Sequence, residues 1–347
     1  MTGIIDITSP GATGSTGTAG ITVLAGGVGG ARFVRGLREL LSSGSGGATP
    51  ITVIANTGDD MWLTGLRVCP DLDSLMYTLG GANDEVRGWG RAGETERVSA
   101  ELTAYGVGWP WFTLGDLDLS THIARTSMLR DGLTLTEATA RIAERWQPGV
   151  TLLPATDDEV ETHVEIVDPE TGESRPIHFE EWWVRHRAQV PAVRFINRGI
   201  ERARATDAAA SAIADAEVVL LAPSNPVVSI GTIVALPGIA EALRSTAAPV
   251  VGVSPIIGGS AVRGMADACL RAIGVETSAL AVGEHYGARS AGGIIDGWLV
   301  GDEDVASVPH LSAAGIASAA APLWMTDVAA TAAMADAALA LASRVAR

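Results

Sequence analysis

Four aspartates lie close together in the sequence and could bind a divalent cation. Asp59 and Asp60 follow an apolar stretch in "NTGDD", and Asp71 and Asp73 follow in "CPDLDS". Carboxylates that converge on phosphates suit Mg²⁺, which prefers one or two carboxylates together with phosphate oxygens. A helix cap at Asp71 and a solvated turn at Asp59 and Asp60 would explain the same residues without a metal. The sequence alone leaves both interpretations open.

A glycine cluster precedes the aspartates and is typical of an anion-binding turn. It stands in "ITVLAGGVGGARFVRGL" (residues 21–37), where an apolar strand leads into a helix. Its glycines let backbone N–H groups point at a phosphate; they are Gly26, Gly27, Gly29 and Gly30. A nicotinamide fingerprint does not fit, because Arg32 replaces its last glycine and the next strand ends in Asn56 rather than an acid. A tight turn with no ligand is the alternative.

Two later loops also carry small and polar residues directly after an apolar strand. They read "APSNP" and "SPIIGG". The residues that we expect to contact a phosphate-bearing ligand there are Ser224, Asn225, Pro226, Ser254, Gly258 and Gly259. Each loop alone would be an ordinary turn, but four such segments in one fold predict a large ligand that carries phosphates.

The charged residues restrict the chemistry. The 24 basic residues are all arginine, so a Walker-A lysine, a Schiff base and a lysine general base are excluded. An anionic substrate must therefore be met by arginine, by backbone N–H groups or by a metal ion. The net charge of −16 argues against broad binding to nucleic acid. Cys69 and Cys269 are too few for a disulfide framework or a thiolate metal site.

Apolar strands alternate with helical segments, which predicts an α/β fold with a doubly wound, mostly parallel Rossmann-like sheet. The expected strands are residues 21–25, 51–56, 217–222, 249–254 and 278–282. The expected helices are residues 31–41, one that starts near 71, about 94–105, about 136–146, and one from 327 onward. Ligands bind at the carboxyl ends of the strands in such sheets, which is where the glycine, aspartate, Ser-Asn and Gly-Gly segments fall.

The middle of the chain reads differently and predicts an inserted α+β subdomain at residues 117–196. The Rossmann-like core would then be residues 20–116 and 197–347, after a flexible tail at 1–19. The insertion contains a hairpin pattern and a Trp-rich stretch, "EEWWVRHR", whose Trp182 could form a wall for an aromatic ligand or pack in a core. The histidines of this region have no metal-ligand spacing, and we expect each to be satisfied or on the surface; they are His122, His163, His178 and His186.

The location of the protein can also be predicted. No apolar run approaches the ~20 residues of a membrane-spanning helix. The N-terminus lacks the basic start and apolar block of a secretory signal. We therefore expect a soluble, cytoplasmic protein without a membrane partner.

Taken together, the motifs resemble the 2-phospho-L-lactate transferase family, and more narrowly its actinobacterial phosphoenolpyruvate transferase branch of coenzyme F420 biosynthesis. The motifs are "AGGVGGARFVRGL", "NTGDDMWLTGLRVCPDLDSLMYTLGG", "RGWG", "LGDLDLSTH", "LLPATDD", "IHFEEWWVRHR", "APSNPVVSIG" and "SPIIGGSAVRGMAD". They run from about Ile21 to the last helix, nearly the whole chain.

The resemblance implies an activity and a set of roles. A phosphoenolpyruvyl (or 2-phospho-L-lactyl) group would pass from a guanosine diphosphate conjugate to the terminal hydroxyl of the deazaflavin Fo. GMP would be released, Mg²⁺ would be required, and the protein would be a homodimer. Asp59 and Asp73 would be catalytic, and the metal ligands would come from Asp59, Asp60 and Asp73. Fo would contact Asp73, Thr113 and Trp182.

Two departures from the family pattern bear on the acceptor. Thr113 stands where the family often has a basic residue before Leu-Gly-Asp, and Leu117 stands where it tends to have arginine. Two other classes stay open as alternatives. One is a nucleotide-sugar-binding regulator of the same fold, like the gluconeogenesis factor family, and the other is a nicotinamide oxidoreductase, which the failed fingerprint disfavours.

Overall fold

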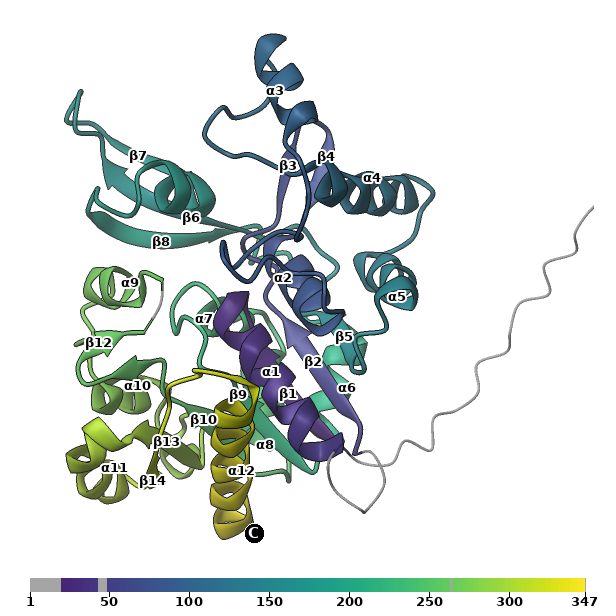
Figure 1. Cartoon of the computed structure of the whole chain (residues 1–347). Helices are drawn as coiled ribbons and strands as arrows, with labels where there is room; N and C mark the ends of the chain where they lie inside the picture. Colours follow the sequence, from purple (N-terminus) through teal and green to yellow (C-terminus); the bar gives the residue numbers. More distant parts are fainter. Residues whose placement is uncertain (1–19, 43–48, 263, 347) are drawn as a thin grey trace, which may run out of the picture.

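Strands and helices alternate along most of the chain, and seven of the strands form one parallel sheet (Figure 1). The structure is a computed structural model that describes residues 20–42, 49–262 and 264–346. The strand order is β14-β13-β10-β9-β1-β2-β5, and every neighbouring pair is parallel. The strands are β1 (Ile21–Ala25), β2 (Ile51–Ala55), β5 (Thr151–Pro154), β9 (Val218–Leu221), β10 (Val250–Val253), β13 (Gly297–Gly301) and β14 (Ala317–Ala321). The order runs outward from β1 in both directions, which confirms the doubly wound fold.

Helices cover both faces of this sheet because both faces of its strands are apolar. One face carries α1 (Gly27–Ser42), α2 (Pro70–Leu79), α5 (Leu135–Trp146) and α12 (Val328–Val345). The other carries α6 (Asp207–Ala214), α7 (Ile230–Ala235), α8 (Ile239–Ser245), α9 (Ala266–Ala272), α10 (Ala279–Tyr286) and α11 (Val308–Ala313). Along β1 the alternation is direct, since Val23 packs in the first core and Leu24 in the second.

Smaller units stand above the carboxyl ends of the strands (Figure 1). An antiparallel sheet in the order β7-β6-β8 is built from β6 (Glu161–Val167), β7 (Ser174–His178) and β8 (Ala192–Arg198), with a π-helical turn at Glu181–Arg185. The hairpin of β3 (Met61–Leu63) and β4 (Leu66–Val68) packs with α4 (Asp116–Arg130) beside α3 (Arg97–Ala104). Short pieces complete the fold: β11 (Ile256–Ile257), β12 (Ser260–Ala261), and 3-10 turns at Arg289–Ala291 and Asp302–Ser307.

The predicted domain division stays a prediction. The range 117–196 supplies the separate sheet unit β6–β7, but it also supplies β5, which pairs with β2 at the edge of the main sheet. The predicted tail, residues 1–19, lies outside the described residues.

One predicted strand was wrong. Residues 278–282, "SALAV", begin α10, because the hydroxyl of Ser278 accepts a hydrogen bond from the N–H of Ala281 and caps a helix there. The helix expected near Asp71 begins at Pro70, one residue earlier, and Asp71 is not its cap. The C-terminal helix is confirmed, with Asp327 as its N-cap.

The C-terminal helix α12 is the one helix among the described residues that is long and apolar enough to cross a membrane. It packs against α1 and against the main sheet, and Met334, Ala338 and Leu341 are buried in the first core. The helix is 33% buried, so packing against the core accounts for part of its apolar composition.

The contact between α1 and α12 leads to a test of stability. A Cβ on Gly36 would lie 2.5 Å from the Cγ2 and 2.7 Å from the main-chain carbonyl carbon of Thr331. We expect Gly36→Ala to lower the free energy of unfolding by about 1–3 kcal/mol, although alanine is the better helix former. Urea denaturation measures this. Adding Thr331→Ala should not restore stability, because the main-chain carbon remains; full rescue would show that the side chain alone limits the approach.

Candidate active site

The segments singled out in the sequence meet at one edge of the sheet. Gly26 follows β1, Asn56 follows β2, Ala222 leads from β9 into the Ser-Asn loop, and Ser254 follows β10. Because these four strands are parallel neighbours, their carboxyl ends lie side by side. This is the edge at which doubly wound sheets bind ligands.

The glycine turn is pressed against the loop after β9 and against α2. The Gly26 N–H donates to the hydroxyl oxygen of Ser224 (3.1 Å), and that hydroxyl donates back to the Gly26 carbonyl (2.7 Å). A Cβ on Gly26 would lie 2.6 Å from Oδ2 of Asp71, and one on Gly30 would lie 2.7 Å from Oγ of Ser224. Gly27 has a φ of +60° at the first position of α1. Larger residues would therefore displace the turn from its neighbours.

The other residues expected at the donor mainly shape their own loops. Oδ1 of Asn225 accepts from the N–H of Val227 (2.9 Å) and of Val228 (3.2 Å). The Ser254 hydroxyl exchanges hydrogen bonds with the main chain of Ile256. Pro226 is buried, and Gly258 and Gly259 have φ of +57° and +76°. The side chains of Asn225 and Ser254 are therefore engaged in hydrogen bonds within their own loops.

Three buried carboxyl groups lie near the glycine turn and have no arginine partner among the described residues. They are Asp59, Asp71 and Glu180, and we call them the arginine-free group. None of them forms an ion pair within the described ranges 20–42, 49–262 and 264–346. Asn56 donates to Oδ2 of Asp71 (2.9 Å), and Oδ1 of Asp59 is buried without a hydrogen-bond partner in the same ranges.

Burial and mutual repulsion shape the titration of this group. Burial raises the pKa of Asp59 well above its ordinary value, and the charges of Asp71 and Glu180 raise it further. Burial raises the pKa of Asp71 to about 6, against the opposing hydrogen bond from Asn56. Burial and the charge of Asp71 raise the pKa of Glu180 to about 8. The group is short of positive charge, which a cation would supply.

The other two predicted acids each have an arginine. Oδ2 of Asp60 lies 3.4 Å from Nη2 of Arg67. Both oxygens of Asp73 accept from the guanidinium of Arg125, at 3.0 Å for Nη1 and in a second, closer contact for Nη2. All four side chains are almost completely buried. The four aspartates of the sequence motif thus divide into two electrostatically different sets.

A third cluster adjoins Asp73. Nδ1 of His122 lies 3.5 Å from Oδ2 of Asp73, and Nε2 of His122 lies 3.4 Å from Oδ2 of Asp118. The carboxylate of Asp118 accepts a hydrogen bond from the Tyr77 hydroxyl (2.7 Å). One ligand atom from each of Asp73, Asp118 and His122 lies within 4.8 Å of the others, so the three could hold a metal ion. Arg125 already occupies both oxygens of Asp73, however.

Of the two places expected for Trp182, the structure shows the one in a core. The Trp182 ring is fully buried in the core of the β6–β8 unit, and its N–H donates to the carbonyl of Val190 (2.7 Å). It therefore packs the subdomain and shows no free face. Trp109 and Trp111 instead form a stacked pair with ring centroids 4.8 Å apart, and both are partly exposed.

The loop with the two family departures lies in the same region. Thr113 is half-buried and lines a small cavity of about 30 Å³ with Trp109 and Phe112. Leu117 is exposed, and its carbonyl accepts from Nη1 of Arg91 (2.9 Å).

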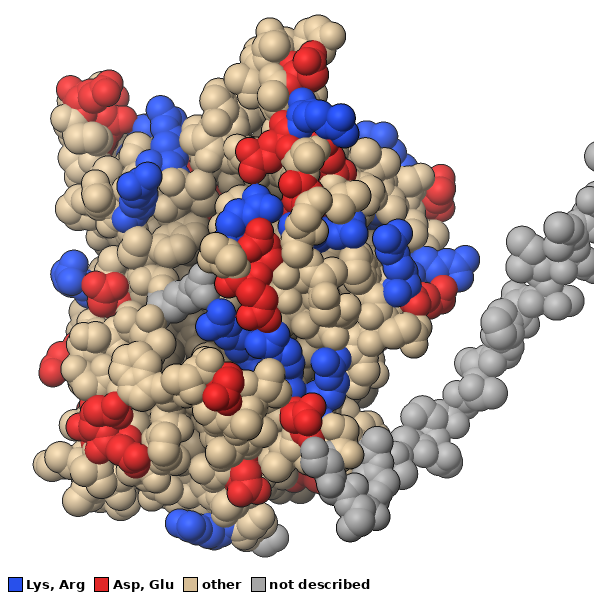
Figure 2. All heavy atoms as spheres, in the orientation of Figure 1, with Lys and Arg blue, Asp and Glu red and all other residues tan. Residues whose placement is uncertain are grey.

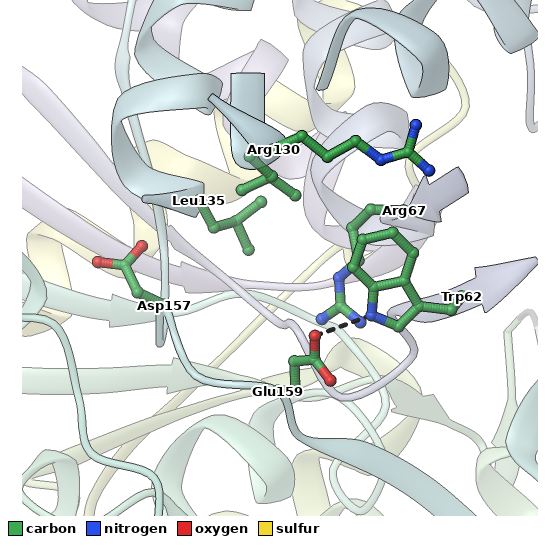
Figure 3. A pocket seen from close by; sticks show the side chains of 7 residues that line it. Trp62, Arg67, Arg130, Leu135, Asp157 and Glu159 are labelled. Carbon is green, nitrogen blue, oxygen red and sulfur yellow. Dashed lines mark hydrogen bonds between the residues drawn. The ribbon is translucent and has the colours of Figure 1, made fainter. Parts of the chain in front are cut away.

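A larger cavity of about 240 Å³ lies elsewhere, among β3, β4, α4 and α5. Its lining residues are Trp62, Arg67, Leu129, Arg130, Leu135, Asp157 and Glu159 (Figure 3). The indole N–H of Trp62 donates to Oε1 of Glu159 (2.8 Å) across it. No residue of the glycine turn lines this cavity.

Sequence reasoning missed Glu180, Arg67 and the polar face of α4. A signal for that face exists, since Asp118, His122 and Arg125 stand at positions i, i+4 and i+7 and therefore share one side of a helix. Glu180 follows the apolar end of β7 but gives no spacing signal. Its place beside Asp71 depends on how the β6–β8 unit folds over the main sheet.

Comparisons with known proteins agree with the motifs. Residues 21–334 match the family model for 2-phospho-L-lactate transferase CofD. The phosphoenolpyruvate transferase of Mycobacterium avium (strain 104) is 54% identical over 334 residues, which are 92% of this chain and 98% of that protein. The corresponding protein of Mycolicibacterium smegmatis is 55% identical over 324 residues, with the same coverage.

A solved structure shares the fold. A member of the UPF0052 family from Bacillus halodurans superposes with a TM-score of 0.58 and covers 94% of this chain and all of its own. At 17% identity this likeness concerns the fold alone. The family match spans most of the chain, and the transferase relatives match it nearly end to end, so the chain belongs to the 2-phospho-L-lactate transferase CofD family.

Proposed function

We propose that this transferase moves a phosphoenolpyruvyl group from a guanosine diphosphate conjugate to the terminal hydroxyl of the deazaflavin Fo, in coenzyme F420 biosynthesis. The observation that carries the proposal is the glycine turn packed against the arginine-free group at the switch point of the sheet. The mycobacterial relatives, named phosphoenolpyruvate transferases, favour the enolpyruvyl over the lactyl group. A mass spectrum of the product distinguishes the two, because they differ by two hydrogens.

The donor would lie across the ends of β1, β9 and β10. Backbone N–H groups at the start of α1 would face its phosphates, and the helix dipole adds to this. Arg32 follows within the first turns of α1, and Figure 2 shows arginine side chains on the surface over this helix. These groups supply the positive charge that a lysine-free chain cannot supply otherwise.

Magnesium fits the arginine-free group better than the Asp73, Asp118 and His122 cluster. Asp59 has an unpartnered buried oxygen, whereas both oxygens of Asp73 are held by Arg125. Asp59 and Asp71 would hold the ion beside the diphosphate, where it would neutralise charge on the phosphate oxygens. Asp60, paired with Arg67, would help to keep the loop in place.

The reaction itself needs positioning and one proton acceptor. The Fo hydroxyl oxygen forms a bond to the phosphorus that carries the enolpyruvyl group, and the bond from that phosphorus to the GMP oxygen breaks. GMP leaves with the electron pair. The hydroxyl proton passes to a carboxylate that does not hold the ion, and Asp73, which the family resemblance places against the acceptor, is the candidate. Trp109 and Trp111 would stack against the deazaflavin ring, in place of Trp182.

The setting of the enzyme completes the proposal. We place it in the cytoplasm, since its substrates are small metabolites and α12 is part of the core. A homodimer is the expected assembly, and sedimentation of the purified protein measures it.

The metal assignment leads to a prediction. Excess EDTA should abolish turnover, and Mg²⁺ should restore it. Asp59→Asn should lower kcat by ~10²-fold and raise the Mg²⁺ concentration needed for half-maximal activity, because it removes a charged ligand. Asp118→Asn is the matched control and should leave the Mg²⁺ requirement unchanged. If only the Asp118 variant shifts it, the ion binds in the cluster with His122.

The glycine turn leads to a second prediction. Gly27→Ala introduces a side chain at φ +60° beside Asp71 and should weaken binding of GDP by ~10-fold or more, through the displaced N–H groups. Gly132→Ala is the control, because it carries the same kind of strain (φ +95°) in an open turn between α4 and α5. Calorimetry with GDP and with Fo separates the effects. Equal losses for both ligands would point to damage to the fold.

Buried acids also predict a pH dependence of stability. The raised pKa values of Glu180 and Asp71 mean that the folded protein binds more protons than the unfolded chain between about pH 4 and 8. The free energy of unfolding should therefore fall as pH rises through this window. Glu180→Gln removes one such group. With metal ions removed by EDTA, the free energy of unfolding of this variant should exceed that of the parent by about 1–3 kcal/mol at pH 7.5 and should be similar to it at pH 5. Urea denaturation at the two pH values tests this; a difference independent of pH would contradict it.

A further inference from the structure

Arg125 is a charged residue that no substrate can reach. It lies in the middle of α4, its side chain is 1% exposed, and its guanidinium bonds both oxygens of Asp73 on α2. The interaction is therefore a bidentate pair between two helices, and its partners are 52 positions apart in the sequence. Such a pair fixes the direction of the carboxylate as well as its charge.

The guanidinium is itself held in place. Its Nη1 also donates to the carbonyl of Arg67 (3.3 Å), at the centre of β4, and lies 3.3 Å from Nδ1 of His122 on the preceding turn. Arg67 in turn pairs with Asp60 in the aspartate motif. Arg125 thus ties α2, α4 and β4 together at one point directly behind the motif.

We propose that Arg125 is a positioning residue for the transferase, which fixes the Asp73 carboxylate as an oriented anion rather than a metal ligand. The inference rests on the proposed function, because it concerns how Asp73 serves the same reaction. Both oxygens of Asp73 are occupied by guanidinium nitrogens, so the carboxylate can present only its remaining lone pairs toward the acceptor. A metal ion in their place would have to displace a buried guanidinium, which would be left unpaired at a high energetic cost.

Lysine would not replace Arg125. Its ammonium group keeps the positive charge but cannot bond both carboxylate oxygens in the fixed fork geometry. Arg125→Lys therefore keeps the positive charge but loses the fixed orientation of the Asp73 carboxylate, and Arg125→Met removes both. Asp73→Asn together with Arg125→Met removes the two charges at once, so that no unpaired charge stays buried.

The experiment compares Arg125→Lys, Arg125→Met, Asp73→Asn and the double variant, each checked for folding by thermal melting. Arg130→Met is the control, because Arg130 lies on the same helix with a guanidinium on the surface. We expect Arg125→Lys to lower kcat by ~10-fold or more while the KM for the donor and the Mg²⁺ requirement stay within about twofold. The double variant should be no slower than Asp73→Asn alone, since Arg125 acts through Asp73.

Other outcomes would overturn the inference. A Mg²⁺ requirement that rises in Arg125→Lys would make Asp73 a metal ligand. Equal kcat in folded Arg125→Lys and the parent, or additive losses in the double variant, would reduce Arg125 to a structural residue. If Arg125→Met does not fold, the lysine and double variants still decide the question. Failure of the proposed function can be told apart from failure of this inference, because the parent enzyme itself would then make no product from Fo and the donor.

Discussion

The central constraint in this molecule is the burial of several carboxylates at one edge of a sheet in a chain without lysine. Each buried charge must be paired, protonated or neutralised by something that binds. Asp60 and Asp73 are paired with arginines that are themselves buried, and Asp118 is bonded by Tyr77 and lies beside His122. Asp59, Asp71 and Glu180 have no such partner in the described part of the chain, and burial raises the pKa of each.

The parallel sheet provides the rigid part of the arrangement. Its strands place the glycine turn, Asn56 and the Ser-Asn loop side by side, and the reciprocal bonds between Gly26 and Ser224 fix the turn to the neighbouring strand. The arginines come from elsewhere, from β4 and α4, which pack above the strand ends. The site thus combines a rigid edge of the main sheet with acids whose arginine partners come from elements inserted between the strands.

The sequence was informative where local pattern and tertiary position agree. The strands β1, β2, β9 and β10 are continuous apolar runs, and their carboxyl ends carry the residues that were expected there. It was less informative for α4, because the buried side of this helix is polar and gives little apolar periodicity. β14 was missed for a related reason, since its sequence, "ASAAA", favours a helix and becomes a strand only by pairing with β13. Trp182 could not be assigned from sequence, because a tryptophan in a core and one in a ligand pocket give the same pattern.

The charge balance also explains why binding of the donor and binding of the metal ion should depend on each other. In the proposed function, a nucleoside diphosphate conjugate would bring negative charge to a place where three carboxyl groups already lie without an arginine partner among the described residues. When the three carboxyl groups are protonated, the folded protein does not bury their negative charge, but protonated groups could not hold a cation firmly. A divalent ion bound together with the diphosphate would reverse this, because it would favour the deprotonated carboxylates and the phosphate oxygens at the same time. The protein would therefore release protons as the ion and the diphosphate bind.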